Sequence, residues 1–132
     1  YEAPRTRFVA TFLGASNLLS GHVEGYCNGQ VAIRVAGHLI YLSHAGLDQG
    51  ATVYLSLRPE KIRICAASQF MGQVREITYK GATTYVEVDL NGVAFAVSCD
   101  SAQIFALQCV PSSPVGLEWD PCDVIVLEDR PQ

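Results

Sequence analysis

Alternation of apolar and polar residues is the main pattern along the chain. In residues 84–90 every second residue is apolar, namely Val86, Val88 and Leu90. This spacing is typical of a strand with one buried face. Similar apolar runs predict ten short strands, at residues 22–27, 30–35, 39–42, 51–57, 61–65, 72–79, 84–90, 93–97, 115–119 and 123–127. Ten short strands joined by turns predict an all-β barrel or sandwich.

Turn and helix signals refine this picture. The pairs Asn28-Gly29 and Asn91-Gly92 each separate two apolar runs. A type I′ turn needs positive φ at both central residues, so each pair predicts a tight hairpin. Residues 4–13 have an apolar stripe with helical spacing behind a Pro, which predicts a short N-terminal helix. Residues 100–110 are expected to form a loop or a short helix.

A proline-centred stretch occurs twice. Leu55–Ile64 reads LSLRPEKIRI, and Leu117–Val126 reads LEWDPCDVIV. The predicted strands before each stretch follow in the same order, so we expect a degenerate internal repeat with halves at about residues 17–66 and 71–128. Because Pro lacks an amide donor and keeps its predecessor extended, Pro59 and Pro121 predict corners at which a strand leaves one sheet.

The composition favours a compact domain and disfavours nucleic acid as a partner. Of 132 residues, 49% are hydrophobic and 17% are charged, which suits one domain with a buried core. The net charge of −4 makes the surface repel phosphate backbones. No apolar run approaches the roughly 20 residues that span a membrane, so we expect no direct membrane insertion.

Motifs for metal sites and catalysis are missing from the sequence. The cysteines have no C-x-x-C spacing and are expected to be small buried residues of a reducing compartment: Cys27, Cys65, Cys99, Cys109 and Cys122. The histidines do not supply the close ligand pairs of a zinc site. The phosphate-binding G-x-x-x-x-G-K-[ST], the hydrolase G-x-S-x-G and the metalloprotease H-E-x-x-H are all absent. We therefore expect no catalytic, cofactor-binding or metal-binding residues.

Three stretches nevertheless resemble one family. Tyr1–Gly21, YEAPRTRFVATFLGASNLLSG, resembles the segment Y-x-x-P-x-x-R-F-V-A-x-F-I-G that ends the ATPase part of ATP-binding subunits of bacterial ABC importers. Ser56–Ile64, SLRPEKIRI, is similar to the R-P-E corner of their C-terminal regulatory domain, the TOBE domain. Gly72–Leu90, GQVREITYKGATTYVEVDL, resembles the stretch that follows that corner. Within the family, the chain resembles the polyamine importers, for putrescine or spermidine, most, while ferric-iron and sugar importers share much of the pattern and stay open as alternatives.

The resemblance implies an architecture and a role. It implies two OB-like β-barrel halves in residues 17–132 and a linker helix in residues 1–16 that follows a missing ATPase domain. The chain starts without Met, and we expect it to be part of a longer protein. The implied function is regulation and dimerisation of the ATP-binding subunit at the cytoplasmic side of the inner membrane. The implied partners are a second copy of the subunit and, through the ATPase domain, transmembrane permease subunits.

Four residues are candidates for a corner or a subunit contact: Arg58, Pro59, Glu60 and Trp119. Arg58 and Glu60 flank the proline, and an arginine can hold a carboxylate with two hydrogen bonds, either within the corner or across an interface. Trp119 is the only tryptophan and is expected in the core or as an interface anchor.

Glu87 and Asp89 are candidate polyamine contacts. They share one face of a predicted strand, and a polycation needs several converging carboxylates. Glu76, Asp120 and Asp123 are further acidic candidates, and a plain solvated face is the alternative for all of them.

A second function stays open at this point. A free-standing OB-like module that binds a small oxyanion would need a cluster of backbone amides with Ser, Thr or Lys. The candidates for such a cluster are Ser112-Ser113 and Thr83-Thr84.

Overall fold

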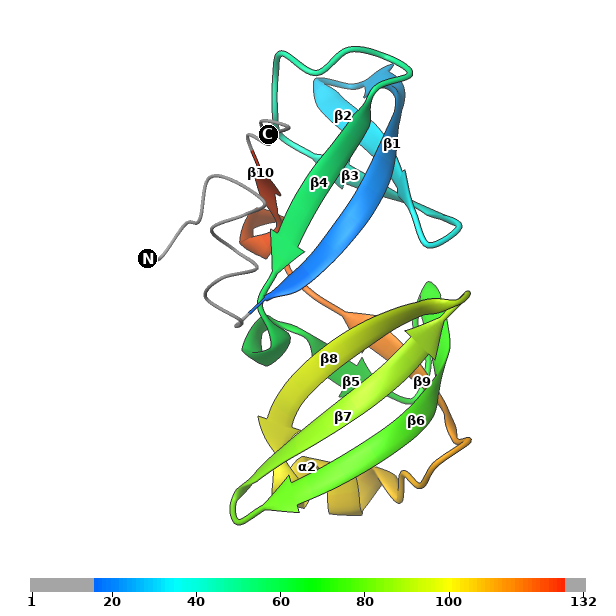
Figure 1. Ribbon diagram of the computed structural model, residues 1–132, viewed down its shortest axis with the longest axis vertical. Helices are drawn as coiled ribbons and strands as arrows, with labels where there is room; N and C mark the ends of the chain where they lie inside the picture. Colours follow the sequence, from blue (N-terminus) through cyan, green and yellow to red (C-terminus); the bar gives the residue numbers. More distant parts are fainter. Residues whose placement is uncertain (1–15, 128–132) are drawn as a thin grey trace, which may run out of the picture. The chain divides into compact units, whose positions relative to one another are not determined.

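The computed structural model describes residues 16–127, which form two five-stranded antiparallel sheets with one α-helix (Figure 1). This confirms a mostly β architecture, which an OB-like fold fits. The expected helix at residues 4–13 and nearly all of the expected linker lie outside the described residues. Among the described residues, no helix combines the length and the hydropathy needed to cross a membrane.

The first sheet has the strand order β10-β4-β1-β2-β3. Its strands are β1 (Asn17–Cys27), β2 (Gln30–Val35), β3 (His38–Leu42), β4 (Thr52–Leu57) and β10 (Ile125–Leu127). Alternate residues point into one core, which includes the fully buried side chains Val23, Val31, Ile33, Leu55 and Leu57. β1 begins at Asn17 rather than at residue 22 because residues 17–22 pair with β4.

The second sheet has the strand order β5-β9-β6-β7-β8. Its strands are β5 (Arg63–Cys65), β6 (Phe70–Lys80), β7 (Thr83–Leu90), β8 (Val93–Asp100) and β9 (Pro114–Glu118). The helix α2 (Ser101–Leu107) lies at one end of β7 and β8 (Figure 1). The core of this sheet includes Val88, Leu90, Phe95, Ile104 and Leu117.

Both prolines stand at corners between the sheets, as predicted. Pro59 begins the 3₁₀ turn η1 (Pro59–Lys61), and the chain passes there from β4 of the first sheet to β5 of the second. Pro121 begins η2 (Pro121–Asp123), where the chain passes back from β9 to β10. The 3₁₀ turns occupy residues that were expected in strands, so β5 and β10 are only three residues long.

Two compact units result from this strand exchange. One contains residues 16–57 with 120–127, and the other contains residues 58–119. The first unit therefore takes its last strand, β10, from beyond the second unit, whereas the second unit is continuous in sequence. The expected half-repeats at 17–66 and 71–128 divide the chain differently and stay a prediction.

The Asn-Gly pairs form the predicted hairpin turns. Asn28 and Gly29 have φ values of 52° and 80°, and Asn91 and Gly92 have φ values of 53° and 88°. Positive φ at both central residues is the signature of a type I′ turn. These turns fix the registers β1–β2 and β7–β8.

Candidate functional site

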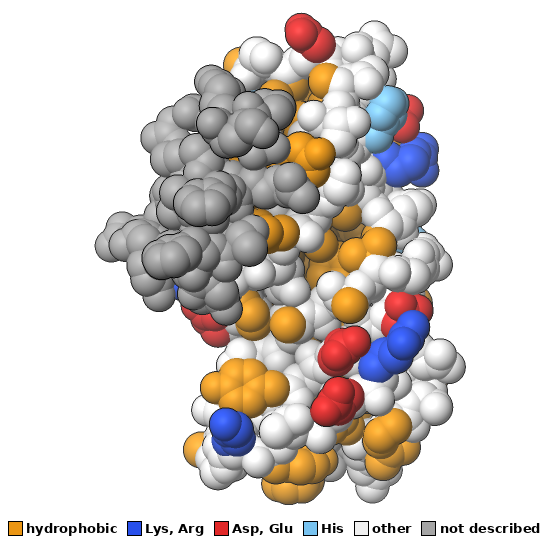
Figure 2. Space-filling model, in the orientation of Figure 1, with side chains coloured by type: hydrophobic (Ala, Val, Ile, Leu, Met, Phe, Trp, Pro, Cys, Tyr) orange, Lys and Arg blue, Asp and Glu red, His pale blue; other side chains and the backbone are white. Residues whose placement is uncertain are grey.

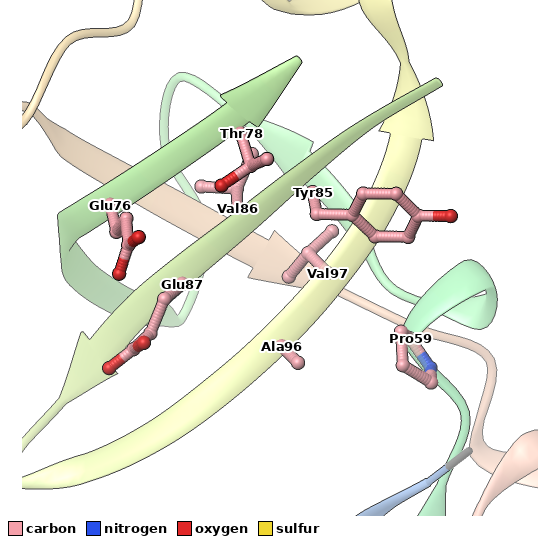
Figure 3. A pocket seen from close by; sticks show the side chains of 8 residues that line it. All are labelled: Pro59, Glu76, Thr78, Tyr85, Val86, Glu87, Ala96 and Val97. Atoms are coloured by element: carbon pink, nitrogen blue, oxygen red, sulfur yellow. The ribbon is translucent and has the colours of Figure 1, made fainter. Parts of the chain in front are cut away.

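An open groove of about 260 Å³ runs across the solvent-facing side of the second sheet (Figure 3). We call it the outer groove. Its lining comes from four elements and includes Pro59 of η1, Glu76 and Thr78 of β6, Tyr85 and Glu87 of β7, and Ala96 of β8. Alternate residues of a strand share one face, so Tyr85 and Glu87 both lie on the outer face of β7. Val86 and Val88 lie on the opposite face of β7 and are buried.

Two carboxylates face each other across this groove. Glu76 on β6 is the direct cross-strand partner of Glu87 on β7. Both residues are exposed, and neither forms an ion pair within residues 16–127. Their side chains point the same way (Figure 3). Like charges directly opposite each other destabilise a sheet, so this pair would favour a cation between the two carboxylates.

A β-bulge sets the position of Arg75, the basic residue that precedes Glu76 in the chain. The β6–β7 register shifts between Val74 and Glu76, which leaves Arg75 as the extra residue. Arg75 Nη2 lies 3.3 Å from Asp89 Oδ1. Figure 2 shows acidic side chains gathered over this sheet with a basic one beside them. Arg75 therefore balances Asp89, and among residues 16–127 no basic side chain forms an ion pair with Glu76 or Glu87.

The groove also offers an aromatic surface and open space. Tyr85 is 48% exposed, and its ring lies over β8 towards Pro59 (Figure 3). Ala96 is the cross-strand neighbour of Glu87 on β8, and its small side chain leaves room in front of the carboxylate. Two carboxylates beside a tyrosine ring suit an organic cation, which both groups attract.

The sequence predicts Glu87 and Asp89 as the candidate polyamine contacts and Glu76 as a further acidic candidate. Glu87 and Asp89 do lie on one face of β7, and Glu87 lines the groove. Asp89 does not line the groove, and its ion pair with Arg75 reduces the charge it offers. Glu76 is the second groove carboxylate, and only the register of β6 against β7 brings it to Glu87.

Three of the four corner candidates, Arg58, Pro59 and Glu60, lie at the start of η1. Arg58 Nη1 is 3.8 Å from Glu60 Oε2, and the Glu60 side chain is 53% exposed. Such a long, exposed ion pair contributes little to stability. A subunit contact through Arg58 and Glu60 stays a prediction.

Trp119 is half-buried at the end of β9. Its ring stacks on Phe70, with centroids 4.6 Å apart, and lies 6.0 Å from the ring of the buried Phe95. This packing is what a core residue would show, while a role as interface anchor stays a prediction.

A second groove, of about 410 Å³, lies in the first unit. Its lining includes Ser43, His44, Asp120 and Cys122. The Cys122 thiol donates a hydrogen bond to Asp120 Oδ1 at 3.3 Å. This bond and the charge of Asp120 raise the pKa of the Cys122 thiol above its usual value. Within residues 16–127, no three His, Cys, Asp or Glu side chains are grouped so that they could hold a metal ion.

The two candidate anion clusters are occupied by internal hydrogen bonds. Thr84 is buried, and its hydroxyl lies 2.6 Å from Ser101 Oγ. The amide of Ser112 donates to Val74 O, and the amide of Ser113 donates to Val110 O. These groups are not free to form a new anion site without breaking existing bonds.

The cysteines differ from the expectation of five buried residues. Cys109 is buried, Cys65 and Cys99 are half-buried, and Cys27 and Cys122 are exposed. Burial, with smaller contributions from Cys109 and Asp100, raises the pKa of Cys99 to about 11. Burial also raises the pKa of Cys109. These two thiols are therefore protonated and weakly reactive near neutral pH.

Comparison with protein families gives one match, to the TOBE domain, over residues 55–127. Among similar proteins is the spermidine/putrescine import ATP-binding protein PotA of Thermobifida fusca, 33% identical over 92% of this chain. The protein of the same name from Rubrobacter xylanophilus is 32% identical over 96% of this chain. The chain spans about a third of these relatives, 34% and 35% of their lengths.

Comparison with solved structures identifies a similar fold. The cytoplasmic molybdate-binding protein ModG, solved with molybdate bound, superposes with a TM-score of 0.71. The match covers 85% of this chain and 95% of that chain, with 17% sequence identity. At this identity the likeness concerns the fold alone.

Proposed function

Because the chain belongs to the TOBE domain family, we propose that it is the regulatory and dimerisation domain of the ATP-binding subunit of an ABC importer for polyamines. The observation that supports this most is the similarity to PotA proteins, which extends over more than nine-tenths of the chain. On this proposal the ATPase belongs to the part of the subunit that these residues do not include, and the chain itself catalyses no reaction.

The proposed partners follow from the same role. A second copy of the subunit would pair with this one, and the ATPase domain would contact the permease subunits. The subunit would work in the cytoplasm at the inner membrane. By differential contacts in the open and closed states, the domain would bias the equilibrium of the ATPase pair.

Two measurements test the role. In source cells, an antibody to this chain should detect a protein much heavier than 14.3 kDa. Deleting the codons for residues 16–132 from that gene should then change spermidine uptake or its inhibition by internal spermidine, while the stable product still hydrolyses ATP. A native protein of 14.3 kDa, or unchanged uptake, would contradict the proposal.

We place the regulatory polyamine contact in the outer groove. Glu87 remains a proposed contact, and Glu76 is a better second carboxylate than Asp89, which Arg75 already neutralises in part. Titration calorimetry with spermidine should give saturable heat that the Glu76→Gln/Glu87→Gln double variant loses. The Asp89→Asn variant should bind more nearly like the unchanged chain. No heat at millimolar spermidine would exclude this contact while leaving the dimerisation role intact.

Oxyanion binding is the second candidate function, because a protein of similar fold is described as molybdate-binding. Calorimetry with molybdate tests it directly. The internal hydrogen bonds of Thr84, Ser112 and Ser113 lead us to expect no saturable heat.

A further inference from the structure

The first sheet carries apolar side chains on the face that points away from its core. Its strand β4 lies between β1 and β10 (Figure 1). Leu55 of β4 points into the core, so its neighbours Tyr54 and Ser56 point to the opposite face. Direct cross-strand partners share a face, so three apolar residues of the adjacent strands join them there. We call this surface the β4 outer face: Leu18, Tyr54, Ser56, Ile125 and Leu127.

The β4 outer face is buried, which is unusual for the outward side of a sheet. Ser56 is 1% exposed and Leu127 is 5% exposed, and the other three residues are half-buried. Within residues 16–127, the first unit has one sheet and one short helical turn, η2, which contacts β3. The outer side of an antiparallel sheet normally carries solvated polar residues. This face therefore has the composition and the burial of a surface against which a further segment packs.

Residues 4–13 offer a complementary surface. They lie outside the described residues, and their sequence predicts a short helix. With 3.6 residues per turn, Arg7 and Thr11 fall on one side of that helix. A helix this short is marginal in water unless its apolar side packs against something. The apolar side is the stripe Phe8, Val9, Phe12 and Leu13.

The chain connection brings this stripe to the β4 outer face. Asn17 is buried, and its Nδ2 donates to Leu57 O at 3.0 Å, which fixes the start of β1 beside the end of β4. Only residues 14–16 separate the stripe from Asn17, so Leu13 lies within about 14 Å of Asn17. Leu18 of the β4 outer face follows Asn17 directly. So short a connection gives the stripe a high effective concentration at this face.

We propose that residues 4–13 of the same chain occupy the β4 outer face and dock there through their apolar stripe. Ser56 is small and stands between Leu18 and Ile125, which leaves space for an aromatic ring. The docking does not require the proposed function. Where that function holds, the segment also follows the ATPase domain, so docking would tie the position of that domain to β4, the strand that leads into the Pro59 corner.

Nuclear magnetic resonance of the 132-residue chain tests the contact directly. Nuclear Overhauser effects should connect ring protons of Phe8 or Phe12 with methyl protons of Leu18, Ile125 or Leu127. The variants Phe8→Leu and Phe12→Leu assign the ring signals, and mixtures of labelled and unlabelled copies show whether the effects arise within one chain. Absent effects, effects only between chains, or effects on these methyl groups from other segments alone would overturn the proposal.

A double-mutant cycle tests whether the contact carries energy. Phe12→Ala should lower the midpoint of thermal unfolding of the first unit by at least about 4 °C, whereas Thr11→Ser on the other side of the segment should leave it nearly unchanged. In the Leu127→Ala background the effect of Phe12→Ala should shrink by at least half, because its contact is already weakened. In the Tyr26→Ala background it should persist, because Tyr26 lies at the far end of β1.

Leu18→Ala takes the place of Leu127→Ala in this cycle if the latter chain does not fold. Equal effects of Phe12→Ala in the two backgrounds would refute the docking. Neither experiment measures uptake, so failure of this inference and failure of the proposed function are distinguishable.

Discussion

At the scale of single residues, the second sheet holds a charge arrangement that is not optimal for stability. Glu76 opposes Glu87 directly, and the adjacent Arg75 is paired with Asp89. Residues that lower the stability of a fold often do so because they serve binding. Glu76 and Glu87 both line the outer groove, so cation binding there would account for their unfavourable pairing.

Two variants on one face of β7 should therefore shift stability in opposite directions. Glu87→Gln removes the repulsion from Glu76 and should raise the free energy of unfolding by about 0.5 kcal/mol. Asp89→Asn removes the partner of Arg75 and should lower it by up to about 1 kcal/mol. Urea denaturation at low and high salt measures both effects, and both should shrink at high salt. A loss of stability in Glu87→Gln would show that the two carboxylates do not repel each other.

The thiols give a second prediction at this scale. Burial raises the pKa of Cys99 to about 11, and only the thiolate is alkylated. In the folded chain at pH 8, iodoacetamide should modify the exposed Cys27 well before Cys99. The rate at Cys99 should keep rising with pH up to about 11. Peptide mass spectrometry separates the sites, and equal rates at pH 8 would contradict the assignment.

At the scale of elements, a buried polar pair, Thr84 and Ser101, helps to attach α2 to the sheet. Ser101 Oγ donates to Gly81 O at 2.8 Å, so the Thr84 hydroxyl must donate to Ser101 Oγ at 2.6 Å. These bonds connect the start of the helix to the β6–β7 turn and to β7.

Removing both partners should cost less than the sum of removing each one alone. Ser101→Ala leaves the buried Thr84 donor without an acceptor and should lower stability by about 2 kcal/mol. Adding Thr84→Val removes that donor, so the double variant should be more stable than the sum of the two single effects predicts. Thermal unfolding of the four chains measures the coupling. Strictly additive effects would show that the pair does not act as a unit.

The same scale shows what the sequence could predict. Strand period and Asn-Gly turns are local signals, and they located nearly every element and the shared face of Glu87 and Asp89. Strand pairing is not local: β5 pairs with β9, where Arg63 faces Glu118. The contact between Glu76 and Glu87 depends on a bulge of one residue at Arg75, and such a shift exchanges the two faces of a strand. No local sequence pattern indicates that Arg75 is the extra residue of a bulge.

At the scale of the whole molecule, the proline corners make the two units unequal in sequence. All five strands of the second sheet and α2 lie within the continuous residues 58–119. The first unit needs β10, which arrives only after the second unit is complete. Without β10, β4 would be left as an open edge.

Fragments should reflect this asymmetry. Residues 58–119 contain a complete core and should fold alone, with low stability because a domain of this size buries only about 60% of its unfolded surface. Residues 1–57 lack the strand that covers β4 and should stay largely unfolded. Amide dispersion in two-dimensional NMR and cooperative thermal unfolding distinguish the cases. If residues 58–119 were unfolded alone while residues 1–57 folded, strand exchange would not govern the folding of this chain.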